Sequence, residues 1–221
     1  LGAKINLHAE NPDLIDMRTE QFLKEGKTSA WYHYLSRPEF VEAEADKRAV
    51  HWAKHLEAPL YIVHMADKEG LEECIKAKTE GHEIYIETCP QYLIFTDEAY
   101  PALGARIKCN PAIKRPEDRD ALRRAVADGI IDSIATDHAP HLPEEKQGTA
   151  LTAVSGMPMI QFSLPVMLQM CSEHEFTVER IVQEMCHNPA LIYGIQNRGF
   201  IRPGYYADLV IADDDCEPYT I

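Results

Sequence analysis

The sequence lacks any apolar run of about 20 residues, the length that a helix needs to cross a bilayer. Its first residues, Leu1 to Leu7, also lack the layout of a signal peptide. Positive charge is scarce, because 22 lysines and arginines stand against 36 aspartates and glutamates, for a net charge of −14. A broad electropositive surface for nucleic acid or anionic lipid is therefore not expected. We predict a cytoplasmic protein without membrane or nucleic-acid partners.

Paired cysteine motifs are also missing. The six cysteines are scattered along the chain, and no C-x-x-C pair or dense spacing links them. This spacing argues against a disulfide scaffold or a cysteine-based metal site, and we expect free, buried thiols. These cysteines are Cys74, Cys89, Cys109, Cys171, Cys186 and Cys216.

What the sequence does contain is an alternation of strand-like and helix-like segments. The length of 221 residues and the 45% hydrophobic content suit one globular domain. The alternation predicts parallel strands connected by helices, as in a (β/α) barrel. The expected strands cover residues 5–9, 59–64, 84–89 and 130–137, and the expected helices cover 36–57, 70–80, 115–128, 159–171, 178–187 and 189–194. In the helix 36–57, an apolar stripe that includes Trp52 and Leu56 is expected to be buried.

The end of the chain departs from this alternation. Residues 201–213 form a turn followed by a strand-like segment that no helix follows. We predict the α/β class, with residues 1–200 as the C-terminal portion of a (β/α)8 TIM-like barrel. Residues 201–221 are expected to enter a small β-sandwich.

Three of the predicted strands end in a side chain that can bind a metal, namely His8, His64 and Asp137. Side chains at the carboxyl ends of barrel strands converge on one site, even when they are far apart in sequence. Imidazole and carboxylate ligands suit Zn²⁺ and related divalent ions, which make hydroxide available at neutral pH. The pattern therefore predicts a metal-dependent hydrolytic site, although each residue alone would more often be structural. Two more histidines, His138 and His141, closely follow Asp137. The other six are expected at the surface, and they are His33, His51, His55, His82, His174 and His187.

Two further segments could contact a ligand or could simply form turns. Asn110 precedes Pro111 after a strand-like run, where asparagine either begins a turn or faces the site. Ser155 and Gly156 lie in a loop whose backbone groups could face a ligand, although such glycine and proline punctuation is typical of ordinary loops.

Several of these motifs resemble the cyclic amidohydrolases, a family of dihydroorotases, dihydropyrimidinases or hydantoinases, and allantoinases. The resemblance covers essentially the whole chain. The run from Thr136 to His141, with the sequence Thr-Asp-His-Ala-Pro-His, is its most specific part. The other matching stretches are His8 to Asn11, Leu35 to Ala45, Tyr61 to His64 and Glu87 to Leu93.

The resemblance implies roles for individual residues. Asp137 would bind one metal and act as the catalytic proton shuttle, while His8 and His64 would hold a second metal. His141 would contact a substrate carboxylate. The ring amide would be bound by Asn110, Ser155 and Gly156. A complete site would hold two Zn²⁺ ions, and the full-length protein would be a homo-oligomer acting on a small cyclic amide.

Within the family, the run 136–141 and Glu144-Glu145-Lys146 favour dihydroorotase. Dihydropyrimidinase, hydantoinase or allantoinase activity is the alternative, and a non-catalytic dihydropyrimidinase-related scaffold is the alternative of another class. The segment Asn110 to Lys114 departs from the family's usual Pro-Pro-Leu-Arg, which puts a substrate contact near Lys114 in doubt. The family's first-half ligands, a His-x-His pair and a bridging residue, are absent from the chain. We therefore expect a fragment that cannot turn over alone.

Overall fold

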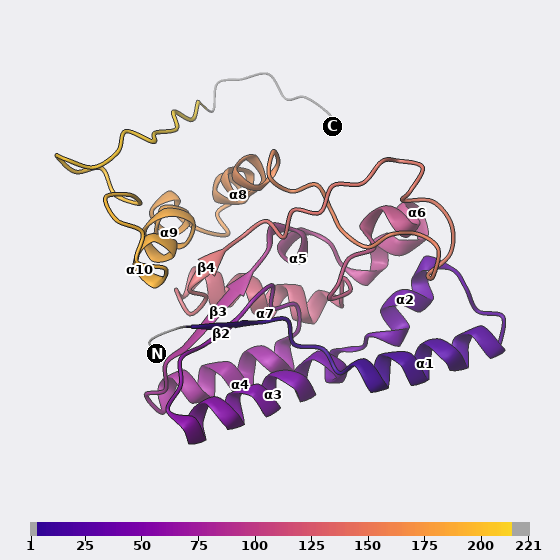
Figure 1. The fold of residues 1–221 in the computed structure, drawn as a ribbon. Coiled ribbons are helices and arrows are strands. Elements are labelled where there is room, and N and C mark those ends of the chain that lie inside the picture. Colours follow the sequence, from indigo (N-terminus) through magenta and orange to yellow (C-terminus); the bar gives the residue numbers. More distant parts are fainter. Residues whose placement is uncertain (1–3, 214–221) are drawn as a thin grey trace.

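Four parallel strands form one sheet in the order β1-β2-β3-β4, so each strand pairs with the next one in the sequence. The computed structural model describes residues 4–213, and Figure 1 shows the helices beside this sheet. Sequential parallel pairing is the arrangement of barrel strands, and it confirms the α/β class. The four strands make up part of a barrel wall. They are β1 (Ile5–Leu7), β2 (Leu60–Ile62), β3 (Ile84–Thr88) and β4 (Ser133–Ile134).

Helices connect the strands as the sequence predicts. The helices α3 and α4 follow β1 and β2 and pack side by side below the sheet in Figure 1. Asp67 caps α4 by accepting a hydrogen bond from the Gly70 amide at 2.7 Å. The α-helices are α1 (Pro12–Lys24), α2 (Ala30–Ser36), α3 (Glu39–Leu56), α4 (Lys68–Thr79), α5 (Pro90–Ile94), α6 (Tyr100–Leu103), α7 (Pro116–Ala127), α8 (Ser163–Ser172), α9 (Val178–Val182) and α10 (Asn188–Ile192). Two 3-10 segments, η1 (Asp97–Ala99) and η2 (Gly104–Ile107), and one π-helical turn, η3 (Gln183–His187), complete the elements.

The core lies between the strands and the helices that cover them. Ile62 of β2 and Ile86 of β3 are fully buried, and they pack in one cluster with Leu122 of α7 and Met167 of α8. Burying side chains of this size stabilises the fold by about 1.5–3 kcal/mol each. The core therefore fixes the positions of the strand ends, where the predicted site residues lie.

The helix 36–57 differs from its prediction at one end. Trp52 and Leu56 were expected in the buried stripe but are 59% and 75% exposed. The rest of the predicted stripe is buried, namely Val41, Ala45, Ala49 and Ala53. The buried face also includes Glu42 and Asp46, one turn apart, because α3 packs against both α4 and the segment after β2. A hydrophobicity pattern assigns such carboxylates to the charged face, so it predicted most of the apolar stripe correctly but missed the polar part of the buried surface.

The sequence pattern also missed four helices and overestimated two strands. Helices α5 and α6 lie in the connection after β3. Helices α1 and α2 fill the connection after β1, and only residues 133–134 of the expected strand 130–137 form strand. Residues 201–213 contain a turn but no strand, because the described part of the chain places no partner strand beside them. The rest of the predicted segment 201–221 lies outside the described residues, and the domain division stays a prediction.

The described helices include none that is both long and apolar enough to pass through a membrane. Three of the cysteines, Cys74, Cys89 and Cys109, are free and buried as expected, whereas Cys171 is half-buried and Cys186 is exposed. Cys216 lies outside the described residues.

Candidate active site

His8 and His64 meet at the carboxyl ends of two adjacent strands. Leu7 of β1 lies in register with Ile62 of β2, so the residues that follow both strands leave the sheet at the same edge. His8 Nδ1 lies 2.8 Å from His64 Nε2. His64 is buried, and its Nδ1 atom has no hydrogen-bond partner among the described residues. Burial and the neighbouring His8 lower the pKa of His64 to about 4, so its imidazole is neutral at pH 7 and can offer a lone pair.

The backbone at two of the strand ends adopts an uncommon conformation. His64 has φ of 45° and Asp137 has φ of 44°, both in the left-handed region that favours glycine. Conformations of this kind cost on the order of 1–3 kcal/mol and cluster at functional sites. The strained positions are two of the three residues that the sequence analysis selected as metal ligands.

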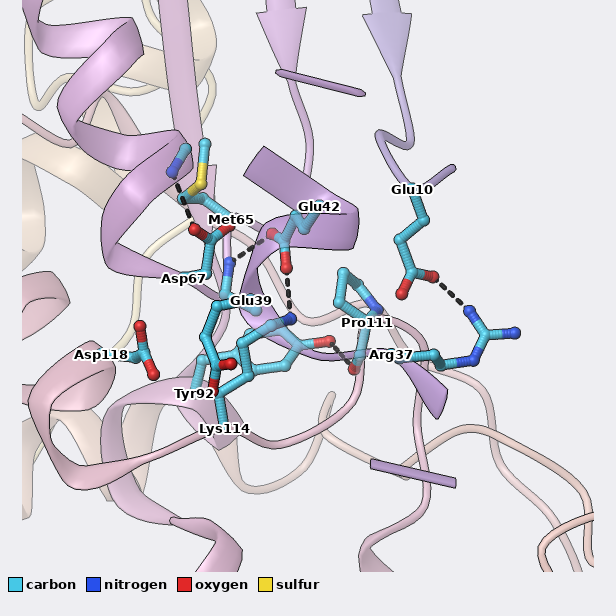
Figure 2. Close-up of polar contacts among 12 residues, drawn as sticks. Glu10, Arg37, Glu39, Glu42, Met65, Asp67, Tyr92, Pro111, Lys114 and Asp118 are labelled. Atoms are coloured by element: carbon cyan, nitrogen blue, oxygen red, sulfur yellow. Dashed lines mark hydrogen bonds and ion pairs between the residues drawn. The ribbon is translucent and has the colours of Figure 1, made fainter. Parts of the chain in front are cut away.

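Glu10 supports His8 from the side opposite to His64. His8 Nε2 lies 3.0 Å from Glu10 Oε2, and the same oxygen pairs with Arg37, as Figure 2 shows. Burial raises the pKa of Glu10, but the hydrogen bond with His8 and the charge of Arg37 outweigh it and leave the pKa lowered. An ionised carboxylate on one ring nitrogen orients the imidazole and raises its basicity at the other nitrogen. The sequence analysis included Glu10 only as part of the matching stretch from His8 to Asn11, and it did not predict a contact with His8.

Asp137 follows β4 and lies near the histidine pair. Partial burial raises the pKa of its carboxyl group, and the charge of His8 opposes that shift. Burial raises the pKa of the half-buried Glu87, and the charge of Asp137 also helps to raise it. Glu87 accepts hydrogen bonds from Tyr61 Oη at 2.6 Å and from the His64 amide at 3.3 Å. His8, His64 and Asp137 do not form a group whose ligand atoms all lie within 4.8 Å of one another. The structure thus pairs the histidines closely and places Asp137 near them.

The predicted substrate-binding residues come together on neighbouring loops. His141 Nε2 lies 3.0 Å from the Ser155 carbonyl oxygen, and the Gly156 amide donates to the Lys108 carbonyl at 2.9 Å. Asn110, two residues after Lys108, has a buried Oδ1 atom without a partner among residues 4–213. A cavity of about 220 Å³ beside this loop is lined by Ser155, but His8, His64, Asp137 and Asn110 do not line it.

One of the histidines expected at the surface is buried. His33 is 6% exposed, and its Nε2 contacts the Cys109 carbonyl oxygen at 2.9 Å. Burial lowers the pKa of His33 to about 3, so the ring is neutral and donates this hydrogen bond. The prediction failed because α2 itself was missed, and with it the packing of α2 against η2.

A cluster of three buried carboxyl groups, which the sequence did not predict, lies next to the segment that follows His64. Glu42, Asp46 and Asp67 place carboxylate oxygens within 4.8 Å of one another. Glu42 accepts hydrogen bonds from the Ala66 amide and from Lys114, and Figure 2 shows this bridge. It therefore holds the short segment between His64 and α4. Lys114, left in doubt as a substrate contact, is a buried partner of Glu42.

Asp46 is the least satisfied member of this cluster, since neither of its oxygens has a partner among the described residues. Burial, followed by the charges of Glu42 and Asp67, raises its pKa well above the ordinary value. A raised carboxyl pKa contributes stability that is present below the ordinary pKa and lost as the pH rises through the raised value. Asp46→Asn should therefore stabilise the protein by about 1–3 kcal/mol at neutral pH, and by less toward acid pH.

Urea unfolding at several pH values tests this prediction. Asp16→Asn, at an exposed position of α1, is the matched control. Equal stabilisation at acid and neutral pH, or destabilisation at neutral pH, would contradict a protonated Asp46.

Comparisons with known proteins found similar sequences over most of the chain. The sequence profile of the amidohydrolase family matches residues 41–220. An allantoinase of Escherichia coli O1:K1 is 32% identical over 211 residues, which cover 95% of this chain and 47% of that protein. An allantoinase of Bacillus velezensis is 31% identical over 100% of this chain and 48% of its own length. The chain thus spans about half the length of the curated relatives it matches.

Solved structures of similar fold also match this chain over about half of their own length. A D-hydantoinase has a TM-score of 0.81 and 33% identity, over 86% of this chain and 43% of its own. A dihydropyrimidinase from Brevibacillus agri has a TM-score of 0.90 and 29% identity, over 94% of this chain and 47% of its own. Such agreement over about half of each neighbour supports a partial TIM-barrel fold.

Proposed function

Because the chain belongs to the amidohydrolase family, we propose that the protein containing it hydrolyses a cyclic amide at a metal centre. The observation that carries this proposal is the contact between His8 and His64 at the ends of adjacent strands, with His64 in a left-handed conformation. Asp137, in the same conformation after β4, supplies a carboxylate nearby.

The residues at this edge suit a divalent metal such as Zn²⁺. His64 is neutral, buried and has an unpartnered ring nitrogen, while Glu10 orients His8. In our proposal His8 and His64 hold one ion and Asp137 contributes to a second ion. Two imidazoles and a carboxylate form a donor set that zinc accepts. When bound, the metal supplies Lewis acidity for the amide carbonyl.

Asp137 carries the proton in the proposed reaction. Its carboxylate accepts a proton from the attacking water and delivers it to the ring nitrogen as the amide bond breaks. The raised pKa of Asp137 favours this exchange, because a stronger base accepts the proton more readily. Asn110 and the backbone of Ser155 and Gly156 bind the ring amide and hold its carbonyl toward the metal edge.

The charges around the loop favour an uncharged ring. A substrate carboxylate would need a free cation, but Lys108 and Lys146 donate to backbone carbonyls and Arg37 pairs with Glu10. The Nε2 atom of His141 contacts the Ser155 carbonyl oxygen, so this nitrogen is not available to bind a substrate carboxylate. The reported relatives carry the names allantoinase, hydantoinase and dihydropyrimidinase. We therefore prefer the alternative of the sequence analysis, hydrolysis of an uncharged cyclic ureide, to dihydroorotase.

A rate comparison on the full-length protein tests the substrate class. Allantoin, hydantoin and dihydrouracil should be hydrolysed at least about tenfold more efficiently than dihydroorotate, since an unpaired carboxylate costs more than 1.4 kcal/mol. A higher efficiency on dihydroorotate would instead favour dihydroorotase, the activity predicted from the sequence. Failure on all four rings, together with absence of metal from the purified protein, would favour the non-catalytic scaffold.

A further inference from the structure

Lys146 lies in the loop after Asp137 and makes an unusual set of contacts. Its Nζ atom donates to the backbone carbonyls of Lys108 at 2.8 Å, Val154 at 3.0 Å and Gly156 at 2.9 Å. An ammonium group has three donors, so all of them are used. No carboxylate within the described residues forms an ion pair with it, and the dipoles of three backbone carbonyls face its charge. Such an arrangement holds the backbone of the two contacted segments in place and does not neutralise a carboxylate.

The three carbonyls belong to the two segments that carry the proposed ring-binding residues. Lys108 lies two residues before Asn110, while Val154 and Gly156 flank Ser155. The Lys108 carbonyl also accepts the Gly156 amide, so one oxygen joins the lysine to both segments. Lys146 therefore links the Asn110 segment to the Ser155 segment directly.

The contacts leave one backbone donor available. The amides of Val154 and Gly156 donate to the carbonyls of Glu145 and Lys108. The Ser155 amide has no acceptor in the part of the chain that the structure describes. Because the carbonyls on both sides of Ser155 bind the Lys146 ammonium, this free N–H group is held in one orientation.

We propose that Lys146 is a positioning residue, whose ammonium group sets the Ser155 and Gly156 backbone against the Asn110 segment for ring binding. This inference rests on the proposed function. Three donors in tetrahedral array are required, and the planar guanidinium of arginine cannot direct its donors to three converging carbonyls. Burial lowers the pKa of Lys146 to about 8, which is consistent with a cation that lacks a carboxylate partner.

The test uses Lys146→Met and Lys146→Arg in the full-length protein. For Lys146→Met, kcat/KM on the preferred ring should fall by roughly 10²-fold, mainly through KM, because a misplaced binding group weakens ring recognition. Lys146→Arg should remain impaired although it keeps the charge. Lys47→Met, at an exposed position of α3, is the control and should keep the wild-type KM. Bound metal should be unchanged in every variant.

Hydrogen exchange of residues 150–157 provides a readout that does not depend on activity. The amides of this segment should exchange faster in Lys146→Met than in the wild type, because their carbonyl anchors are lost. A wild-type KM in Lys146→Met, or full rescue by arginine, would overturn the proposal even if exchange increased. If the wild-type protein hydrolyses no ring, the proposed function fails. If the amides of residues 150–157 then also exchange equally fast in Lys146→Met and the wild type, Lys146 does not position this loop either. Lys146→Gln, which keeps an amide donor, replaces Lys146→Met if that variant does not fold.

Discussion

Replacing Asp137 with asparagine should abolish the proposed turnover of the full-length protein, with a fall in kcat of roughly 10³-fold or more. Asparagine has nearly the same shape as aspartate, but its amide cannot accept the proton that the water loses or deliver one to the ring nitrogen. The φ of 44° at this position is also tolerated by asparagine, which enters the left-handed region more readily than most residues. The loss should therefore be chemical, with the fold retained.

The measurement is kcat on the preferred ring, accompanied by circular dichroism, the melting temperature and the metal content. Asp128→Asn, at the exposed end of α7, provides a control with the same chemical change and should keep full activity. Wild-type turnover in Asp137→Asn would remove the proton-shuttle role. A loss of activity together with a loss of the fold would show that Asp137 is structural.

The sequence predicted that His8 and His64 follow the ends of buried strands, because two simple patterns coincide there. Short, almost fully apolar runs such as residues 59–64 are typical of buried parallel strands, and the ends of such strands converge. His8 and His64 lie 56 positions apart in the sequence, yet their rings meet at 2.8 Å. The pairing follows from parallel register, which the alternation of strands and helices already implies.

Other parts of the site could not be read from the sequence. Glu42 and Asp46 look like members of a charged helix face, and only the packing of α3 on α4 and the loop after β2 reveals that both are buried. Lys146 lies in a polar loop where a lysine would ordinarily be solvated, and its three carbonyl contacts depend on loop conformation alone. Residues of this kind act through tertiary contacts that leave no periodic signal.

Removing the ammonium of Lys114 should have the largest effect on stability. Lys114 is 3% exposed and is the cation paired with Glu42 inside the acidic cluster. Burial lowers its pKa, but the carboxylates of Glu42, Asp67 and Glu10 outweigh burial and leave the pKa raised, so the amine is charged. Lys114→Met leaves the Glu42 carboxylate buried without its cation. We expect a loss of about 3–5 kcal/mol in the free energy of unfolding, as for other broken buried ion pairs.

The double variant Lys114→Met/Glu42→Gln separates the loss of the ion pair from the loss of packing. Glutamine keeps a carbonyl oxygen that can accept the Ala66 amide, while it removes the carboxylate that Lys114 neutralised. The double variant should therefore be more stable than Lys114→Met, because deleting both charges costs less than leaving one of them unpaired. Lys76→Met, exposed on α4, should change stability by less than about 0.5 kcal/mol. Equal urea midpoints for Lys114→Met and Lys76→Met would mean that Lys114 does not neutralise the cluster. Midpoints that fall further in the double variant would mean that Glu42 stabilises the segment after His64 through its own charge.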